Sequence, residues 1–225
     1  MTPSVLLLRH GETVWNSAGR LQGCGDSPLT ARGLAQAGAL ARAARALGVS
    51  RVLASPLGRA RATAEHVAAA AGCTLAVRDC LAEMDFGTCA GFTLDELRAS
   101  RPGILEARER DRWHHRWPGG ESYADVLARV RAGLVGDAPL LTAGVTAVVA
   151  HQSVNRALLV WLGGGTPEDA LAGDQPADVI LRVEEGRAVW HAQLGSEPEG
   201  TPFPGRPGIF RRAAARARST YGAPP

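Results

Sequence analysis

Short apolar runs alternate with longer Ala-rich stretches along most of the chain. Runs of this length predict buried strands, at about residues 4–9, 51–54, 74–77 and 145–150. The Ala-rich stretches predict helices at about residues 31–47, 57–71 and 153–162. Thr30 is expected to cap the first of these helices, and Gly48 and Gly72 to end the first two. This alternation predicts an α/β fold, a three-layer α/β/α sandwich around a mostly parallel sheet.

Two segments depart from this alternation. Residues 178–183 and 188–194 flank Glu184-Glu185-Gly186, which predicts a hairpin with one antiparallel strand at an edge of the sheet. Residues 93–137 are predicted to be mostly helical, with interruptions at Pro102 and at Pro118-Gly119-Gly120. At 225 residues one domain is expected, and we place it at 1–199.

All 25 basic residues are Arg, and the absence of Lys excludes a Walker-type phosphate loop and Schiff-base chemistry. Five of these arginines and no acid lie in residues 200–225. Removing their charge from the net +3 leaves −2 for the rest, which argues against a nucleic-acid-binding surface. We expect residues 200–225 to form a loosely held basic tail.

The cellular setting is also predicted from composition. No apolar run approaches the ~18 residues of a membrane span, so no membrane association is expected. The four cysteines show no C-x-x-C spacing, which favours reduced thiols over a disulfide frame or a zinc site. The short polar start of the chain lacks a secretion signal, and we therefore expect a cytoplasmic protein.

Three predicted strands end in chemistry-bearing residues. Arg9 ends the first strand and His10 follows it, Arg59 comes at the turn after the second, and His151 directly follows the strand at 145–150. The carboxyl ends of parallel strands share one edge of a sheet, where open α/β folds bind ligands. Two imidazoles and two guanidinium groups there supply a nucleophile and anion donors, as a phosphate requires.

The surrounding motifs resemble those of the histidine phosphatase superfamily, the phosphoglycerate mutase-like group, and of its phosphatase branch in particular. The resemblance covers about residues 4–195. It is carried, in order, by Arg9-His10-Gly11-Glu12-Thr13 with Asn16, Arg20-Leu21-Gln22-Gly23, Asp26-Ser27-Pro28-Leu29-Thr30 with Gly33, Ser55-Pro56-Leu57-Gly58-Arg59-Ala60-Arg61-Ala62-Thr63, Leu81-Ala82-Glu83-Met84-Asp85-Phe86-Gly87 and Val149-Ala150-His151.

The resemblance implies a role for each matching residue. His10 would become a phosphohistidine, and Glu83 would give a proton to the leaving oxygen. The phosphoryl oxygens would be held by Arg9, Asn16, Arg59, His151 and the backbone of Gln152, which stands where the family commonly has Gly. Gln22 and Gly23 would contact the substrate. No metal or other cofactor is implied, and a neighbouring phosphate dianion is expected to raise the pKa of Glu83.

The family builds a lid between the acid and the second histidine, and we expect that lid at about residues 93–137. Arg112 and Arg116 are predicted to contact an anionic leaving group there. The alternative is a packing role for this stretch, because Trp113 and Trp117 have the i,i+4 spacing of one helix face. Cys89 and Ala90 stand where the family often has Trp and Glu, which leaves substrate packing beside them open.

The sequence therefore predicts a metal-independent phosphomonoesterase for a small phosphorylated metabolite. A cofactor-dependent phosphoglycerate mutase is the alternative at the same site; only 68 positions separate Glu83 from His151, whereas mutases carry a longer insert. A non-catalytic phospho-ligand binding module and a zinc hydrolase using His10, His151 and Glu83 are further alternatives. The substrate and the oligomeric state stay open, with a homodimer among the options.

Overall fold

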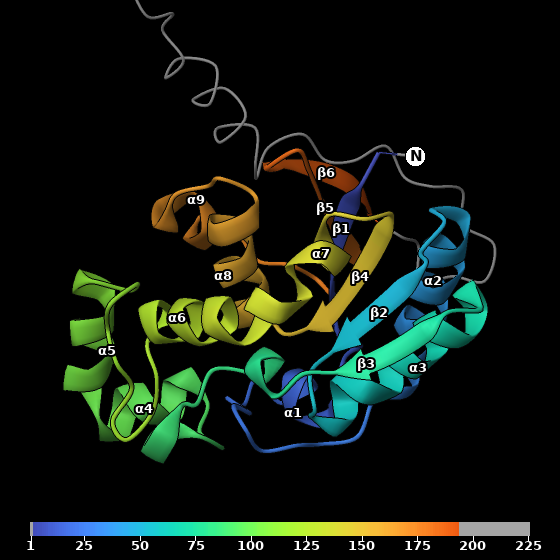
Figure 1. The fold of residues 1–225 in the computed structure, drawn as a ribbon. Helices are drawn as coiled ribbons and strands as arrows, with labels where there is room; N and C mark the ends of the chain where they lie inside the picture. Colours follow the sequence, from blue (N-terminus) through green and yellow to red (C-terminus); the bar gives the residue numbers. More distant parts are fainter. Residues whose placement is uncertain (1, 194–225) are drawn as a thin grey trace, which may run out of the picture.

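The computed structural model describes residues 2–193, which form a six-stranded sheet with helices on both faces (Figure 1). The strand order is β3-β2-β4-β1-β5-β6. The strands are β1 (Ser4–Arg9), β2 (Arg51–Ala54), β3 (Thr74–Val77), β4 (Val145–Ala150), β5 (Val179–Glu184) and β6 (Arg187–Gln193). The sequence predicted the first four at the same positions.

The sheet is parallel from β3 through β1, and an antiparallel hairpin completes it. β5 runs antiparallel to β1, and β6 pairs antiparallel with β5 and forms the edge. The two turn residues, Glu185 and Gly186, both have positive φ, at 48° and 71°. A two-residue turn of this kind matches the twist of the strands it joins. The prediction of a mostly parallel sheet with an antiparallel hairpin at one edge is confirmed; the hairpin's first strand is the antiparallel one.

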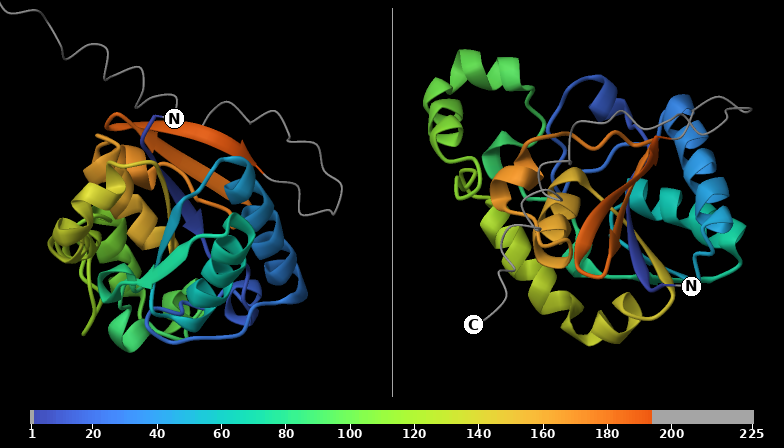
Figure 2. Two further views of the ribbon diagram at one scale, coloured as in Figure 1. Left: turned by 45° about the vertical axis from the view of Figure 1, so that its right-hand side comes forward. Right: turned by 90° about the horizontal axis from the view of Figure 1, so that it is seen from above.

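Alternation within the strands builds two hydrophobic cores. Leu6 and Leu8 of β1 face helices α2 (Ala31–Ala46) and α3 (Gly58–Ala71), whereas Leu7 faces the opposite side. That opposite side is covered by α6 (Tyr123–Leu134) and α8 (Gln152–Leu162), as Figure 2 shows from above. The predicted three-layer sandwich is therefore confirmed.

Close backbone packing fixes the start of α2 against the loop that follows β1. Thr30 caps the helix by accepting a hydrogen bond from the Gly33 amide. A Cβ atom on Gly11 would collide with the Gly33 carbonyl, and one on Gly33 would collide with the Glu12 carbonyl. Only glycines allow this approach, which holds the loop after β1 in one position.

The segment predicted as a lid contains α4 (Leu94–Ser100), α5 (Pro102–Arg110) and α6, and its first two helices lie beside the sandwich (Figure 1). Pro102 starts α5, a position where a missing amide hydrogen costs nothing. Residues 111–122 are not helical, so Trp113 and Trp117 do not share a helix face. Both are nevertheless buried in the core on the α6–α8 side of the sheet.

The remaining elements are short connections. They are α1 (Val14–Ser17), η1 (Asp79–Leu81), η2 (Gly87–Cys89), η3 (Val135–Asp137), α7 (Ala138–Leu141) and α9 (Pro167–Leu171). Within residues 2–193 no helix is long and apolar enough to cross a membrane. The basic tail predicted at 200–225 lies outside the described residues.

Candidate active site

His10 lies at the carboxyl end of β1, where strand register brings it next to His151. Arg9 pairs with Ala150 across the parallel β1–β4 ladder. His10 directly follows Arg9 and His151 directly follows Ala150, so the two histidines leave the ladder at the same level. The His10 amide donates to the Ala150 carbonyl at 3.1 Å, and the two imidazole centroids are 5.1 Å apart. The sheet itself therefore assembles this pair.

The His10 ring has one defined tautomer. Its Nδ1 lies 2.7 Å from the Gly11 carbonyl oxygen, which can only accept, so Nδ1 carries the proton. Nε2 then keeps its lone pair, and it accepts a hydrogen bond from Nε of Arg59 at 3.3 Å. Burial, reinforced by the charges of Arg9 and Arg59, lowers the pKa of His10 well below its usual value. The imidazole is thus neutral and nucleophilic at Nε2.

Arg59, in the first turn of α3, makes hydrogen bonds to protein groups through all three of its guanidinium nitrogens. One terminal nitrogen donates to the Gly25 carbonyl at 2.7 Å and to the Asp26 carboxylate at 3.0 Å, and the other donates to the Gly23 carbonyl at 2.9 Å. Its side chain is only 1% exposed. Gly23, predicted to contact substrate, lines the cavity and also holds this guanidinium. Asp26 belongs to a recognised motif, but its pairing with Arg59 was not predicted.

Arg9 is oriented by a segment far away in the sequence. Its guanidinium donates to the Gln175 carbonyl at 2.9 Å. The Gln175 side chain is buried and donates to the Leu7 and Val179 carbonyls, which ties this segment to β1 and β5. Burial lowers the pKa of Arg9, with Arg59 among the smaller causes. Nothing in the local pattern around Gln175 predicted this contact.

His151 lies at the N-cap position of α8, where its side chain makes no capping hydrogen bond, and it is completely buried. Its Nε2 lies 2.7 Å from the Ser55 hydroxyl, which also accepts a hydrogen bond from the Leu57 amide. Among the described residues the Ser55 hydroxyl has no other acceptor for its hydrogen, so we assign that hydrogen to Nε2 and the ring proton to Nδ1. Within residues 2–193 that Nδ1 has no hydrogen-bond partner. Burial, followed by the influence of His10 and Arg59, lowers the pKa of His151 well below its usual value.

Glu83 lies in the loop after η1, with its carboxylate facing inward. Its Oε1 accepts a hydrogen bond from the Met84 amide at 2.8 Å. Burial raises the pKa of Glu83, and this outweighs the opposing effects of the Met84 amide, Arg59 and Arg9. The direction matches the prediction, but burial is the cause here, where the prediction relied on a phosphate.

A cavity of about 290 Å³ joins these groups. Of the predicted site residues, nine line it: Arg9, His10, Asn16, Gln22, Gly23, Arg59, Glu83, Arg112 and Gln152. His151 is not among the lining residues. Asn16 and Gln22 are also tied to Thr13, and Gln152 donates to Asp174.

The predicted role of Arg116 is not supported by its position. It does not line the cavity, because its guanidinium binds Asp125 and the Gly120 carbonyl. Arg108 takes a place at the cavity that the sequence did not predict, with its guanidinium 5.7 Å from the Trp117 ring centroid.

The cavity is strongly cationic. Six arginines line it and only two acids, Glu83 and Asp174. The arginines are Arg9, Arg20, Arg59, Arg108, Arg112 and Arg156. Arg156 is neutralised by Asp174 and also donates to the Tyr123 hydroxyl. Burial and then the neighbouring Arg112 lower the pKa of Arg108, for which the described residues provide no hydrogen bond or ion pair.

The described part of the chain contains no cluster of side chains suited to a metal ion. Within residues 2–193 no three His, Cys, Asp or Glu side chains gather as they would around a metal ion. His10, His151 and Glu83 therefore do not form the zinc site of the third alternative.

The fold and cavity define an α/β protein with an arginine-rich cavity, lined also by His10, at the carboxyl ends of its parallel strands. Comparison with known proteins names the class. The sequence model of the histidine phosphatase superfamily (branch 1) matches residues 5–194. The chain belongs to this superfamily of enzymes, as its motifs indicated.

Individual relatives carry two kinds of name. Probable phosphoglycerate mutase GpmB of Salmonella paratyphi B is 37% identical over 164 residues, 70% of this chain and 76% of the relative. A mycobacterial glucosyl-3-phosphoglycerate phosphatase is 29% identical and has a TM-score of 0.70, covering 80% of this chain and 90% of that one. The alpha-ribazole phosphatase of Shigella flexneri is 25% identical and has a TM-score of 0.73, covering 88% and 99%.

Proposed function

We propose that this protein is a metal-independent phosphomonoesterase that hydrolyses a small phosphorylated metabolite through a phosphohistidine on His10. The state of the His10 ring carries the proposal. Its Nε2 is unprotonated, is fixed by the Nδ1–Gly11 hydrogen bond, and lies beside Arg59 at a cationic cavity. A neutral imidazole held in this way is an activated nucleophile for phosphoryl transfer.

In the first half-reaction, Nε2 of His10 attacks phosphorus and the bond from phosphorus to the ester oxygen breaks. Arg9, Arg59 and the Nδ1–H of His151 stabilise the phosphoryl oxygens, with Asn16 and the backbone amide of Gln152 beside them. The proton on Glu83 moves to the leaving oxygen. The raised pKa of Glu83 suits this step because it keeps the carboxyl group protonated to higher pH.

In the second half-reaction, the Glu83 carboxylate takes a proton from water as the water oxygen attacks phosphorus. The bond between phosphorus and Nε2 breaks, inorganic phosphate forms, and the neutral His10 and protonated Glu83 are restored. The positive charge needed for this transfer is supplied by guanidinium groups.

The substrate that fits best is a small ester with a second anionic group. The cavity volume is at the low end of the range for ligand sites, roughly 300–1,000 Å³. Arg108 and Arg112 line it beyond the proposed phosphate position, and Nε of Arg112 is buried without a partner in the described residues. A carboxylate or second phosphate would neutralise this wall. A phosphoglycerate, part of two relatives' names, has such a group.

The direct test is hydrolysis of p-nitrophenyl phosphate at pH 5–7 by the wild type and by His10→Ala. We expect His10→Ala to lose activity by about 10³-fold or more. Retained activity would remove His10 from the mechanism, and an inactive wild type would favour the non-catalytic binding module. Loss of wild-type activity in excess chelator would favour metal-assisted hydrolysis.

The mutase alternative is favoured by the name of the GpmB relatives. It is tested with 3-phosphoglycerate and a bisphosphoglycerate primer. We expect release of inorganic phosphate with little isomerisation, and efficient isomerisation would overturn the phosphatase proposal.

We also propose a cytoplasmic location. Cys24, Cys73, Cys80 and Cys89 are free thiols, as is usual in a reducing compartment.

A further inference from the structure

The loop that carries Glu83 is held by residues of the segment 93–137, which we call the insert. Arg129 of α6 donates through one terminal nitrogen to the carbonyls of Cys80 and Ala82, at 2.7 and 3.1 Å. Its Nε and its other terminal nitrogen bind the two carboxylate oxygens of Glu121, at 2.8 and 2.9 Å. The Arg129 guanidinium therefore binds both the main chain directly before Glu83 and the Glu121 carboxylate of the insert.

Glu121 grips the main chain on the other side of Glu83. Its carboxylate accepts a hydrogen bond from the Asp85 amide at 3.0 Å, and its own amide donates to the Asp85 carbonyl at 2.8 Å. The pair of Arg129 and Glu121 thus fixes the main chain at Ala82 and at Asp85. Ala82 directly precedes Glu83, and Asp85 comes two residues after it. We call this pair, with its contacts to 80–85, the acid-loop clamp.

Glycines make the clamp sterically feasible. A Cβ atom on Gly87 would collide with the Pro118 carbonyl, and one on Gly120 would collide with the Asp85 carbonyl. The Thr88 amide also donates to the Pro118 carbonyl at 3.0 Å. The Pro118-Gly119-Gly120 run, which the sequence presented only as a break between helices, therefore lets the insert backbone lie directly against the acid loop.

We propose that Arg129 and Glu121 are positioning residues that hold Glu83 for proton transfer; this inference rests on the function proposed above. A general acid must be within hydrogen-bond reach of the leaving oxygen, and a displacement of about 1 Å can cost 10²-fold in rate. The clamp suits this task because it is a neutral ion pair. It fixes the loop without adding net charge beside a carboxyl group that must stay protonated.

Leaving-group dependence separates positioning from general stability. Esters with a poor leaving group need the acid, whereas p-nitrophenyl phosphate, whose leaving group is good, needs it little. We would measure kcat/KM for p-nitrophenyl phosphate, phenyl phosphate and an alkyl phosphate in the wild type, Arg129→Met and Glu83→Gln. For Arg129→Met we expect a loss of about 10–100-fold on the alkyl phosphate, but under about 3-fold on p-nitrophenyl phosphate.

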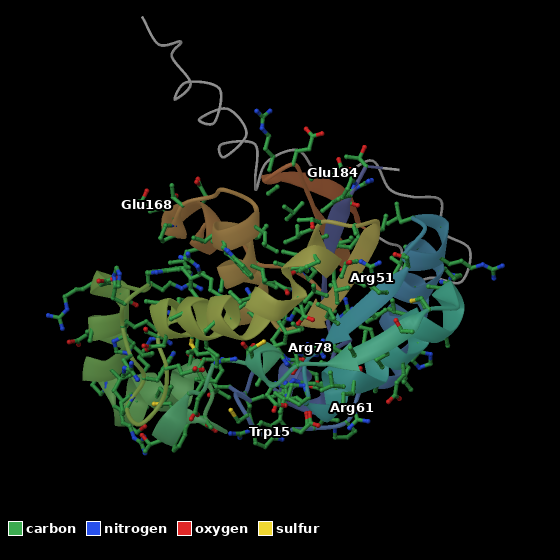
Figure 3. All side chains as sticks on the ribbon, in the orientation of Figure 1. Trp15, Arg51, Arg61, Arg78, Glu168 and Glu184 are labelled. Atoms are coloured by element: carbon green, nitrogen blue, oxygen red, sulfur yellow. The ribbon has the colours of Figure 1, made fainter. Side chains whose placement is uncertain are left out.

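Arg78→Met is the matched control. Arg78, labelled in Figure 3, also pairs through two hydrogen bonds with a carboxylate, that of Asp137, but neither bonds the main chain at 82–85. We expect Arg78→Met to change kcat/KM for all three esters by one common factor. Glu121→Gln keeps an acceptor for the Asp85 amide, so its kcat/KM for the alkyl phosphate should lie between the values for the wild type and for Glu121→Leu.

Two results would overturn the inference. The first is a decrease in kcat/KM by the same factor for every ester in Arg129→Met. This result counts against the clamp when Glu83→Gln shows the expected leaving-group dependence. If Glu83→Gln shows no such dependence, the assignment of the acid fails instead. Amide hydrogen exchange then tests the clamp by itself: residues 82–87 should exchange faster in Arg129→Met than in the wild type or Arg78→Met. Unchanged exchange is the second contradicting result.

Discussion

The two ends of the cavity are built in different ways. The inner end is lined by Arg9, His10 and Arg59, with the buried His151 beside His10. These residues come from the carboxyl ends of β1, β2 and β4, and each side chain is hydrogen-bonded to protein. The outer wall, Arg108, Arg112, Trp117 and Tyr123, comes from the insert, and Arg108 has no hydrogen bond there within residues 2–193. In the proposed mechanism, the residues from the sheet hold the phosphoryl group and those from the insert contact the leaving group.

Glu83 also lines the cavity, and removing its proton should produce the largest effect. Glu83→Gln is expected to slow hydrolysis of an alkyl phosphate by about 10²–10⁴-fold. Because burial raises the pKa of Glu83, wild-type activity should fall as pH rises through that raised value and the acid loses its proton. The pH profile of kcat/KM should lack this alkaline limb in Glu83→Gln. If Glu83→Gln keeps the alkaline limb, the titrating group is a residue other than Glu83.

The rigidity of the inner end is tested by Arg59→Met. We expect kcat/KM for p-nitrophenyl phosphate to fall by about 10²–10³-fold, because a preorganised charge on the transferring group is lost. Arg61→Met is the control, since Arg61 lies on the exposed face of α3 and pairs with Glu65 (Figure 3). Steady-state kinetics should show less than about a 2-fold change for the control. Equal losses would mean that the α3 arginines act through stability.

Substitutions in the outer wall should change substrate specificity and leave the rate of phosphoryl transfer unchanged. Arg108→Ala and Arg112→Ala are each expected to raise KM about 10-fold for a phosphate ester that carries a carboxylate, as loss of a charged hydrogen bond would. p-Nitrophenyl phosphate should be unaffected, and Arg116→Ala should match the wild type on both. A loss on p-nitrophenyl phosphate as large as on the carboxylate ester would remove the distinction between the two ends.

The smallest effect concerns stability in acid. Burial lowers the pKa of His10 and His151 below the value of about 6.5 in the unfolded chain. The unfolded state therefore binds more protons below that pH, and folding stability should fall as pH decreases through this window. Each histidine contributes a slope of up to about 1.4 kcal/mol per pH unit. Denaturant unfolding between pH 7 and 5 should give a shallower slope for His10→Asn than for the wild type.

The same contrast explains what the sequence could predict. Arg9, His10 and His151 could be placed because short apolar runs mark strands and parallel strands end at one edge. Asp26 and Ser55 lie in recognised motifs, but their bonds to Arg59 and His151 join segments distant in the sequence. Arg108 lines the cavity and Arg116 does not, because the Arg116 guanidinium binds Asp125 and the Gly120 carbonyl, contacts that the lid resemblance could not reveal. The division into one domain with a lid and a tail stays a prediction.

Covalent phosphorylation of His10 is the central claim, and Glu83→Gln offers a way to trap it. With p-nitrophenyl phosphate the first half-reaction needs little acid, whereas the second still needs Glu83 as a base. The phosphoenzyme should therefore accumulate in Glu83→Gln, and mass spectrometry of the quenched protein should find an acid-labile phosphate on His10. Sustained turnover with no phosphate on His10, or with phosphate on another residue, would contradict the account.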